Sequence, residues 1–284
     1  MFKMIYNIAR TELQMLFYSP VAWLILVVFG VQSGMLFADQ LAGLVSAQEM
    51  GYDIQGSTIS IFASRWGVFT TMQNYLYFYI PLLTMSLVSK ELSSGSIRLL
   101  YSSPITNTQI IVGKFFSMMI YGLIMIGILF LITLCSWAIV KDFELSMVLT
   151  GLLGLYLLIC AYAAIGIFMS SLTSYQIVAA IGTFAVLMVL SMIGGWWQDY
   201  DFIRDVTYWL SMPGRSGKFI AGLICSEDVL YFVIVVCLFL ALTIILNSVR
   251  QKIRFDYFRK KYRCYFLSLF LGIFVCTSAD ETLP

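Results

Sequence analysis

The chain has 284 residues, of which 61% are hydrophobic and only 11% are charged, and its formal net charge is +2 at pH 7. A soluble domain carries roughly 45–50% apolar and about 25% charged residues, so this chain has too little polar surface to fold in water. It contains no histidine, which excludes Ser-His-Asp and Cys-His catalysis and removes the commonest metal ligand. The six cysteines are scattered singly and are interpreted as small hydrophobic residues.

Residues 1–20 are expected to form an amphipathic helix on the inner membrane surface. Lys3, Arg10 and Glu12 alternate with apolar residues at near-helical spacing. Ser19-Pro20 then ends this helix and turns the chain into the first span. A secretory signal is the alternative, but the segment lacks a compact apolar stretch and a small-residue cleavage site.

Residues 21–247 are predicted to form an all-α, polytopic membrane domain with six transmembrane helices. A helix needs about 20 mainly apolar residues to cross the hydrocarbon core with every backbone group bonded internally. Six blocks meet this requirement, namely 21–38, 67–88, 115–140, 147–170, 177–195 and 229–247. A shorter apolar block, 265–277, is a possible seventh span.

The distribution of basic residues predicts a cytoplasmic N-terminus. With this orientation, twelve of the 17 basic residues lie inside: Lys3, Arg10, Lys90, Arg98, Lys114, Arg250, Lys252, Arg254, Arg259, Lys260, Lys261 and Arg263. Loops rich in Lys and Arg stay in the cytoplasm. Trp66, Trp137, Trp196 and Trp197 fall at the expected outer ends, where indole prefers the headgroup level. The sequence therefore indicates a multi-pass membrane protein with its N-terminus in the cytoplasm.

The inner loop at 89–114 carries the most information. Glu91 stands in a largely apolar stretch and is expected either to cap backbone N–H groups or to pair with Lys90, Arg98 or an arginine of a partner. Gly95 permits a bend or a close helix approach, and Pro104 ends one helix before the Thr106-Asn107-Thr108 cap starts another. A rigid helical hairpin that meets a cytosolic partner is favoured over an ordinary solvated connector.

This loop resembles the cytoplasmic signature of ABC-2-type transporter permeases, which in that family forms a coupling hairpin on an ATPase subunit. The resemblance places Glu91, Gly95, Pro104 and Lys114 on the motif positions and Arg98 in a variable slot. It extends over most of the chain, and within the family it is closest to the gliding-motility permeases of Bacteroidota. It implies a cytosolic ABC ATPase as partner and a second permease subunit, in a homodimer or a heterodimer. It also implies a location in the inner membrane of a bacterium.

The chain lacks the nucleotide-binding string G-x-x-x-x-G-K-[ST]. The stretch from Gly214 to Phe219 comes nearest, but it has the wrong spacing and lies in an outer loop, and the Gly113-Lys114-Phe115 stretch fails for similar reasons. We therefore expect the chain to be no enzyme and to hold no cofactor of its own, with ATP and Mg on the partner ATPase.

Two further segments carry structural expectations. Pro81, followed by Thr84, is a possible hinge in the second span, because proline frees a carbonyl that a hydroxyl can satisfy. The outer loop at 196–228 alternates apolar and polar residues, which suits short re-entrant or interfacial helices. An ordered outer cap without a transport role is an equal alternative for this loop.

The C-terminal region divides into a basic linker, 248–264, and an apolar segment, 265–284. Seven cations between Arg250 and Arg263 suit anionic lipids, at about 1 kcal/mol each near the surface. Nucleic acid is a poorer partner, because the cluster adjoins a membrane span. The segment at 265–277 is either a seventh span that leads to an outer domain absent from this chain or a tail in the interface.

The leading functional hypothesis is the permease subunit of an ATP-driven transporter. An ion-coupled secondary carrier is disfavoured because the predicted spans contain no charged residue and no evident internal repeat. An intramembrane enzyme is disfavoured by the lack of histidine and of paired acids within the spans. A non-transporting scaffold of an envelope or gliding machine remains an alternative. The substrate, whether a lipid-linked glycan, a drug or a peptide, is left open.

Overall fold

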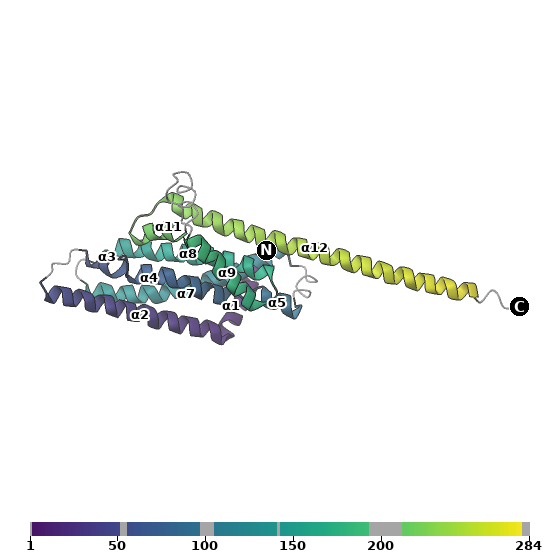
Figure 1. Ribbon diagram of the computed structural model, residues 1–284, viewed down its shortest axis with the longest axis horizontal. Coiled ribbons are helices and arrows are strands. Elements are labelled where there is room, and N and C mark those ends of the chain that lie inside the picture. The colour runs from purple at the N-terminus through teal and green to yellow at the C-terminus, as the bar shows by residue number, and fades with distance from the viewer. Residues whose placement is uncertain (1, 52–55, 97–104, 141–142, 193–211, 280–284) are drawn as a thin grey trace. The chain divides into compact units, whose positions relative to one another are not determined.

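The computed structural model describes residues 2–51, 56–96, 105–140, 143–192 and 212–279, with the backbone alone over 253–279. Every regular element in these ranges is a helix (Figure 1). The chain divides into a unit over Met1–Thr243 and a second unit over Ile244–Pro284. The helices are α1 (Phe2–Tyr18), α2 (Pro20–Glu49), α3 (Ser57–Phe62), α4 (Val68–Thr84), α5 (Ser89–Ser94), α7 (Asn107–Ile139), α8 (Leu145–Leu172), α9 (Gln176–Met192), α11 (Met212–Ile220) and α12 (Ser226–Ala279).

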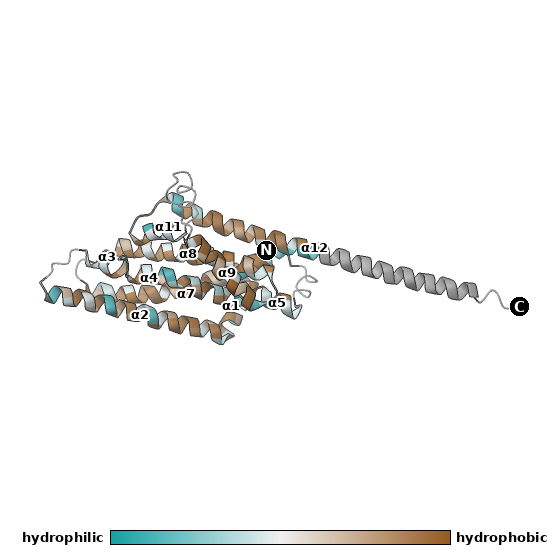
Figure 2. Ribbon diagram, in the orientation of Figure 1, coloured by the Kyte–Doolittle hydropathy of each residue, from teal (hydrophilic) through white to brown (hydrophobic). Residues whose placement is uncertain are grey.

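Four described stretches are long and apolar enough to cross a membrane, and they lie in α2, α7, α8 and the first half of α12. Their hydrophobic character is visible along the ribbons in Figure 2. The helices α4 and α9 have 17 residues each, which corresponds to about 25 Å at 1.5 Å per residue. The all-helical membrane fold is confirmed, whereas the predicted count of six spans plus a seventh is not.

The helix α8 forms the centre of the first unit and packs against α4, α7, α9 and α11. In its most apolar stretch 72% is buried, compared with 28% in α2. Small residues allow its neighbours to approach closely. A Cβ atom added to Gly154 would lie 2.4 Å from Phe219 Cβ of α11, and one added to Gly166 would lie 2.2 Å from Thr84 Oγ1 of α4. These glycines therefore set the spacing of the core, as small residues do between membrane helices.

The two ends of α8 define two ends of the first unit. The N-terminal end of α8 adjoins α11 through Gly154 and adjoins α3, where the Glu144 N–H donates to Thr58 Oγ1 over 3.2 Å. The C-terminal end adjoins α5 through Ser170. We call these the α11 end and the α5 end. Figure 1 shows α1 and α5 together at one end of the helices and α3 and α11 toward the other.

The expected N-terminal helix is present. The helix α1 ends at Tyr18, and α2 starts with Pro20 at its first turn, where proline loses no hydrogen bond. Its buried face consists of Ala9, Glu12 and Leu16, whereas Tyr6 and Tyr18 are exposed. The helix is therefore amphipathic, but an acidic residue lies on its buried side.

The ends of the 89–114 segment are helical, as expected. The helix α5 stops at Gly95, whose φ of 74° is left-handed and suits glycine. The helix α7 starts with a capping box, in which Thr106 and Gln109 satisfy each other's backbone N–H groups. The prediction that the Thr106-Asn107-Thr108 cap starts a helix is confirmed. The hairpin's centre, 97–104, lies outside the described residues.

The sequence predicted a sixth span, a basic linker and a separate seventh segment at the C-terminus, whereas the backbone shows no break between them. One helix, α12, runs without interruption from Ser226 to Ala279. Neither glycine nor proline occurs between residues 226 and 264, so no local signal ends the helix in the basic linker.

Candidate functional site

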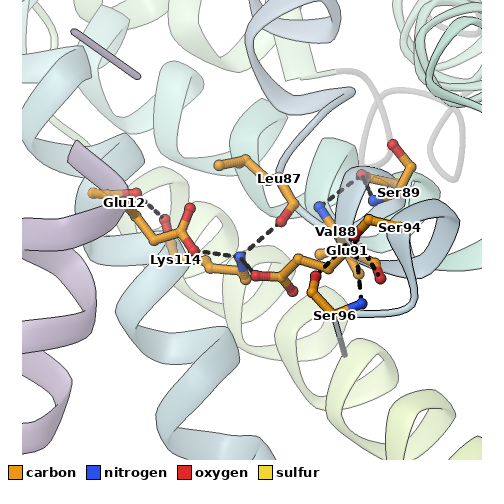
Figure 3. A network of polar contacts seen from close by, with 10 residues as sticks. Glu12, Leu87, Val88, Ser89, Glu91, Ser94, Ser96 and Lys114 are labelled. Atoms are coloured by element: carbon orange, nitrogen blue, oxygen red, sulfur yellow. Dashed lines mark hydrogen bonds and ion pairs between the residues drawn. The ribbon is translucent and has the colours of Figure 1, made fainter. Parts of the chain in front are cut away.

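Three helices that are distant in sequence bring their charged side chains together at the α5 end. Lys114 Nζ of α7 donates to Glu12 Oε1 of α1 over 2.5 Å and to Glu91 Oε1 of α5 over 2.7 Å. It also donates to the Leu87 carbonyl over 2.8 Å. We call Glu12, Lys114 and Glu91 the triad. Figure 3 shows the ammonium group of Lys114 between the two carboxylates, with Leu87 beside it.

The close approach of α1 to α7 depends on Gly113. A Cβ atom at this position would lie 2.7 Å from Ile8 Cγ2 and 3.4 Å from the Ile5 carbonyl oxygen. Real Cβ atoms do not tolerate the first distance, so any larger residue would displace α1. The Gly-Lys pair of the signature therefore acts as a unit, because Gly113 admits α1 and Lys114 binds the carboxylate that α1 brings.

The start of α5 is held against α8 by one hydroxyl group. Ser170 Oγ accepts hydrogen bonds from the backbone N–H groups of Val88 and Ser89 over 3.2 and 3.1 Å. It donates to the Met85 carbonyl over 3.0 Å. These bonds satisfy backbone groups in the turn between α4 and α5 that no regular helix would satisfy. Ser170 of α8 thus fixes the start of α5, the helix that carries Glu91 to the triad.

The charge of the triad is unbalanced. A lysine ammonium has three N–H donors, and all three of Lys114 are used by Glu12, Glu91 and Leu87. Lys114 is 1% exposed and the Glu91 side chain is 18% exposed. Burial raises the pKa of Glu91, against the lowering effect of Lys114. Two carboxylates therefore share one buried cation.

A cavity of about 530 Å³ opens beside the triad. Glu12, Glu91 and Lys114 line it, together with Lys90. Hydroxyl groups of Ser19 and Ser86 and the apolar side chains of Leu16, Val21, Leu82 and Leu83 complete much of the wall. Its size lies within the range of about 300–1,000 Å³ that small-molecule sites occupy.

A second buried ion pair lies at the α11 end. Arg215 Nη1 of α11 donates to Asp228 Oδ1 of α12 over 2.5 Å, and both side chains are at most 3% exposed. The guanidinium lies 4.4 Å from the centre of the Tyr231 ring, a cation–π distance. Lys218 Nζ lies 3.7 Å from the other Asp228 oxygen. The Gly214–Phe219 stretch, nearest in sequence to a nucleotide-binding loop, is thus part of the buried helix α11.

The helix α11 is also anchored to the core by neutral hydrogen bonds. Gln73 Nε2 of α4 donates to the Pro213 carbonyl over 3.1 Å. Thr150 Oγ1 of α8 donates to the Phe219 carbonyl over 3.2 Å. Phe219 is fully buried. The described part of the outer loop is therefore a helix packed into the bundle, while 193–211 lie outside the described residues. Both earlier interpretations of this loop, a re-entrant helix and an ordered outer cap, stay predictions.

Of the predicted coupling residues, the structure joins Glu91 and Lys114 directly. The partner of Glu91 is Lys114, which was not among those expected, and Gly95 ends α5 next to them. Arg98 and Pro104 lie outside the described residues. Pro81 lies inside α4 three residues before its end, and the Thr84 hydroxyl donates to the Ile80 carbonyl over 3.0 Å. The hinge at Pro81 stays a prediction.

Sequence reasoning missed the roles of Glu12, Ser170 and Asp228. Glu12 follows Ala9 by three positions and precedes Leu16 by four, so its position on the apolar face of α1 was readable from the sequence. Ser170 and Asp228 carry no such signal. Both act across distances that only the tertiary structure reveals, and a serine near a helix end usually bonds its own helix.

Charged side chains connect three helices at this site. The triad links α1, α5 and α7 through one side chain. In the ranges that the structure describes, no group of three or more His, Cys, Asp or Glu side chains could hold a metal ion.

Comparison with protein-family models gives one match. Residues 6–197 match the family described as ABC-2 family transporter protein. The match covers more than half of the chain and contains the described helices from α2 to α9, most of α1 and the complete triad. A search of curated proteins found no match.

Proposed function

This chain belongs to the ABC-2 family of transporter proteins, and we propose from that premise that a separate ATPase drives it by pushing on α5. Membership makes it a multi-pass membrane protein and the permease subunit of an ABC transporter, a type of transporter that requires an ABC ATPase as partner. Our proposal adds the route by which the energy enters, together with the sidedness and the assembly of the protein.

The Glu91–Lys114 ion pair is the observation that carries the proposal. It connects a six-residue helix at the edge of the bundle to α7, a helix of 33 residues. Part of α5 is exposed at Lys90, Ser93 and Ser94, and a partner can contact it there. Because Lys114 also holds Glu12, a displacement of α5 moves α1 and α7 together.

We propose that the α5 end faces the cytoplasm of a bacterium and that the protein lies in the inner membrane. The distribution of Lys and Arg supports this orientation. The ATPase partner supplies the ATP and Mg sites, and the chain itself is no enzyme. A second permease subunit, identical or different, completes the pathway, and anionic lipids contact the segment from Arg250 to Arg263. The likeness to gliding-motility permeases supports a role in the cell envelope.

Purification of the full chain from its native membrane tests the proposal. An ABC ATPase is expected to copurify. The variant Glu91→Lys is expected to reduce its association, because this change places a second lysine beside Lys114 in the triad. Glu227→Lys, at the first turn of α12, introduces the same charge change at the α11 end and serves as the matched control. Transport that follows an ion gradient without any ATPase would contradict the proposal and favour a secondary carrier.

A further inference from the structure

The cavity beside the triad has a chemistry that its role in coupling does not require. A joint between helices needs a tight contact, yet about 530 Å³ of open space adjoins it. Three of the charged residues around this space come from the triad. Glu12 is 7% exposed and Lys114 is 1% exposed. The space is therefore built around buried charge, as a ligand site is.

The hydrogen bonds of the triad define which charge the cavity accepts. Lys114 has no donor left, because its three N–H groups bind Glu12, Glu91 and Leu87. Each carboxylate uses one oxygen for Lys114, and among the described residues no further donor reaches either second oxygen. An entering cation with N–H groups would satisfy these oxygens. An entering anion would meet two carboxylates, and among the described lining residues the one cation not already bound to them is the exposed Lys90.

The other side of the cavity is apolar. Leu16 and Leu83 are buried in its wall, while Val21 of α2 and Leu82 of α4 are 41% and 43% exposed. Val21 belongs to a helix that is long and apolar enough to cross a membrane, and Leu82 belongs to α4, which contacts that helix. The cavity thus offers carboxylate oxygens at one side and an apolar edge at the other, which is the pattern that an amphipathic molecule matches.

We propose that this cavity binds the protonated primary amine of an amphipathic molecule, whose apolar chain passes Val21 and Leu82 into the membrane. The ammonium donates to the free oxygens of Glu12 and Glu91 and balances the negative charge that Lys114 leaves. The hydroxyls of Ser19 and Ser86 are available to the remainder of the headgroup. The inference rests on the proposed function only for the placement of the α5 end at the cytoplasmic leaflet.

Native mass spectrometry of the delipidated full chain tests this proposal with four added probes. These are hexadecylamine and the phosphatidylethanolamine, phosphatidylcholine and phosphatidylglycerol that carry the same acyl chains. We expect the two primary amines to be retained one to one, roughly tenfold more than phosphatidylcholine, whose quaternary ammonium has no N–H donor. Preference for phosphatidylethanolamine over hexadecylamine identifies an aminophospholipid as the source of the amine, and the reverse order identifies a free amphipathic amine.

Two variants locate the site. Glu91→Gln is expected to weaken retention of the amines roughly tenfold, because the ammonium loses a charged acceptor. Ser86→Phe fills the cavity and leaves the triad intact, so it is expected to abolish the preference for amines. Leu131→Phe places the same aromatic side chain on the exposed side of α7, away from the cavity, and is the control.

Equal retention of phosphatidylcholine and phosphatidylethanolamine, or an unchanged preference in Ser86→Phe, would overturn the proposal. Copurification of the ATPase with the unaltered chain is measured in parallel. If amine binding fails while the ATPase still copurifies, only this inference is wrong. If no ATPase copurifies, the proposed function fails whatever the result with the amines.

Discussion

The two buried ion clusters of the first unit differ in what they connect. At the α5 end, Lys114 joins residues that lie 102 and 23 positions away in the sequence and that belong to two other helices. At the α11 end, Arg215 joins Asp228, only 13 positions away. The first cluster adjoins an open cavity, and its Glu91 reaches solvent. The second is almost fully buried beneath the Tyr231 ring.

Because of this difference we call the triad the joint and the Arg215–Asp228 pair the latch. In the proposed function, a partner displaces the partly exposed link at the α5 end, and this link carries the displacement into α1 and α7. The link at the α11 end joins α11 to the start of α12 and is almost closed to solvent. Substitutions at the two ends are therefore expected to have similar effects on stability but different effects on coupling.

Lys114→Met is expected to have the largest effect. It leaves two buried carboxylates without a cation, a change that costs about 3–5 kcal/mol for a buried pair. We expect a loss of thermal stability of the purified chain in detergent, together with a loss of ATPase association. The measurements are the unfolding midpoint and the amount of copurified ATPase.

A triple variant separates stability from coupling at this site. Lys114→Met combined with Glu12→Gln and Glu91→Gln removes the uncompensated charge, so most of the stability is expected to return. The link between α5 and α7 is still absent, so coupling is expected to stay impaired. Recovery of both properties would show that the triad has a structural role alone.

Arg215→Met is expected to destabilise the chain by about 3 kcal/mol, at the lower end of the range for a buried pair, because Lys218 remains 3.7 Å from Asp228. ATPase association is expected to be unaffected, since α11 and α5 lie toward opposite ends of the first unit (Figure 1). The same two measurements as for Lys114→Met apply. An equal loss of ATPase in both variants would remove the distinction between joint and latch.

Gly113→Ala is expected to cost about 1–3 kcal/mol through overpacking, because the added methyl group would lie 2.7 Å from Ile8 Cγ2. Ile8→Ala removes Cγ2 but leaves Cβ, which would lie 2.9 Å from the added methyl group. The double variant is therefore expected to regain only part of the loss. Thermal unfolding of the four proteins in a mutant cycle checks this. If the stability loss in the double variant equals the sum of the losses in the two single variants, Gly113 and Ile8 are not in contact.

Thr106→Ala is expected to have the smallest effect, about 1 kcal/mol, because it removes one half of the capping box at the start of α7. Thr108→Ala, two residues later, is the matched control and is expected to have less effect. Thermal unfolding measures both. A larger loss in Thr108→Ala would place the start of α7 elsewhere.

The elements that the sequence predicted well are those with local signals. Ser19-Pro20 marks the junction of α1 and α2, and Thr106 with Gln109 marks the start of α7, because capping and proline effects act within a few residues. The ABC-2 family was identified from the Glu91 to Lys114 stretch, and the family match confirms it. The gliding-type subfamily stays a prediction.

The parts that the sequence did not predict depend on tertiary contacts. The second expected span, 67–88, corresponds to a helix that ends at Thr84, where the turn bound by Ser170 begins. The described part of the fifth, 177–195, is helical to Met192. The pairing of Lys114 with Glu12 spans 102 positions, and no periodic pattern joins residues at that separation. Charge pairs of this kind can be identified only when the positions of the helices in three dimensions are known.

The rate of ATP hydrolysis by the copurified complex tests the central claim most directly. It should be compared in the unaltered protein, in Arg215→Met and in the triple variant at Glu12, Glu91 and Lys114, each reconstituted in the same lipid. The account predicts that Arg215→Met keeps the permease-dependent rate, whereas the triple variant loses most of it despite its restored stability. Equal rates in the triple variant and the unaltered protein would contradict the claim that α5 drives α7 through Glu91 and Lys114.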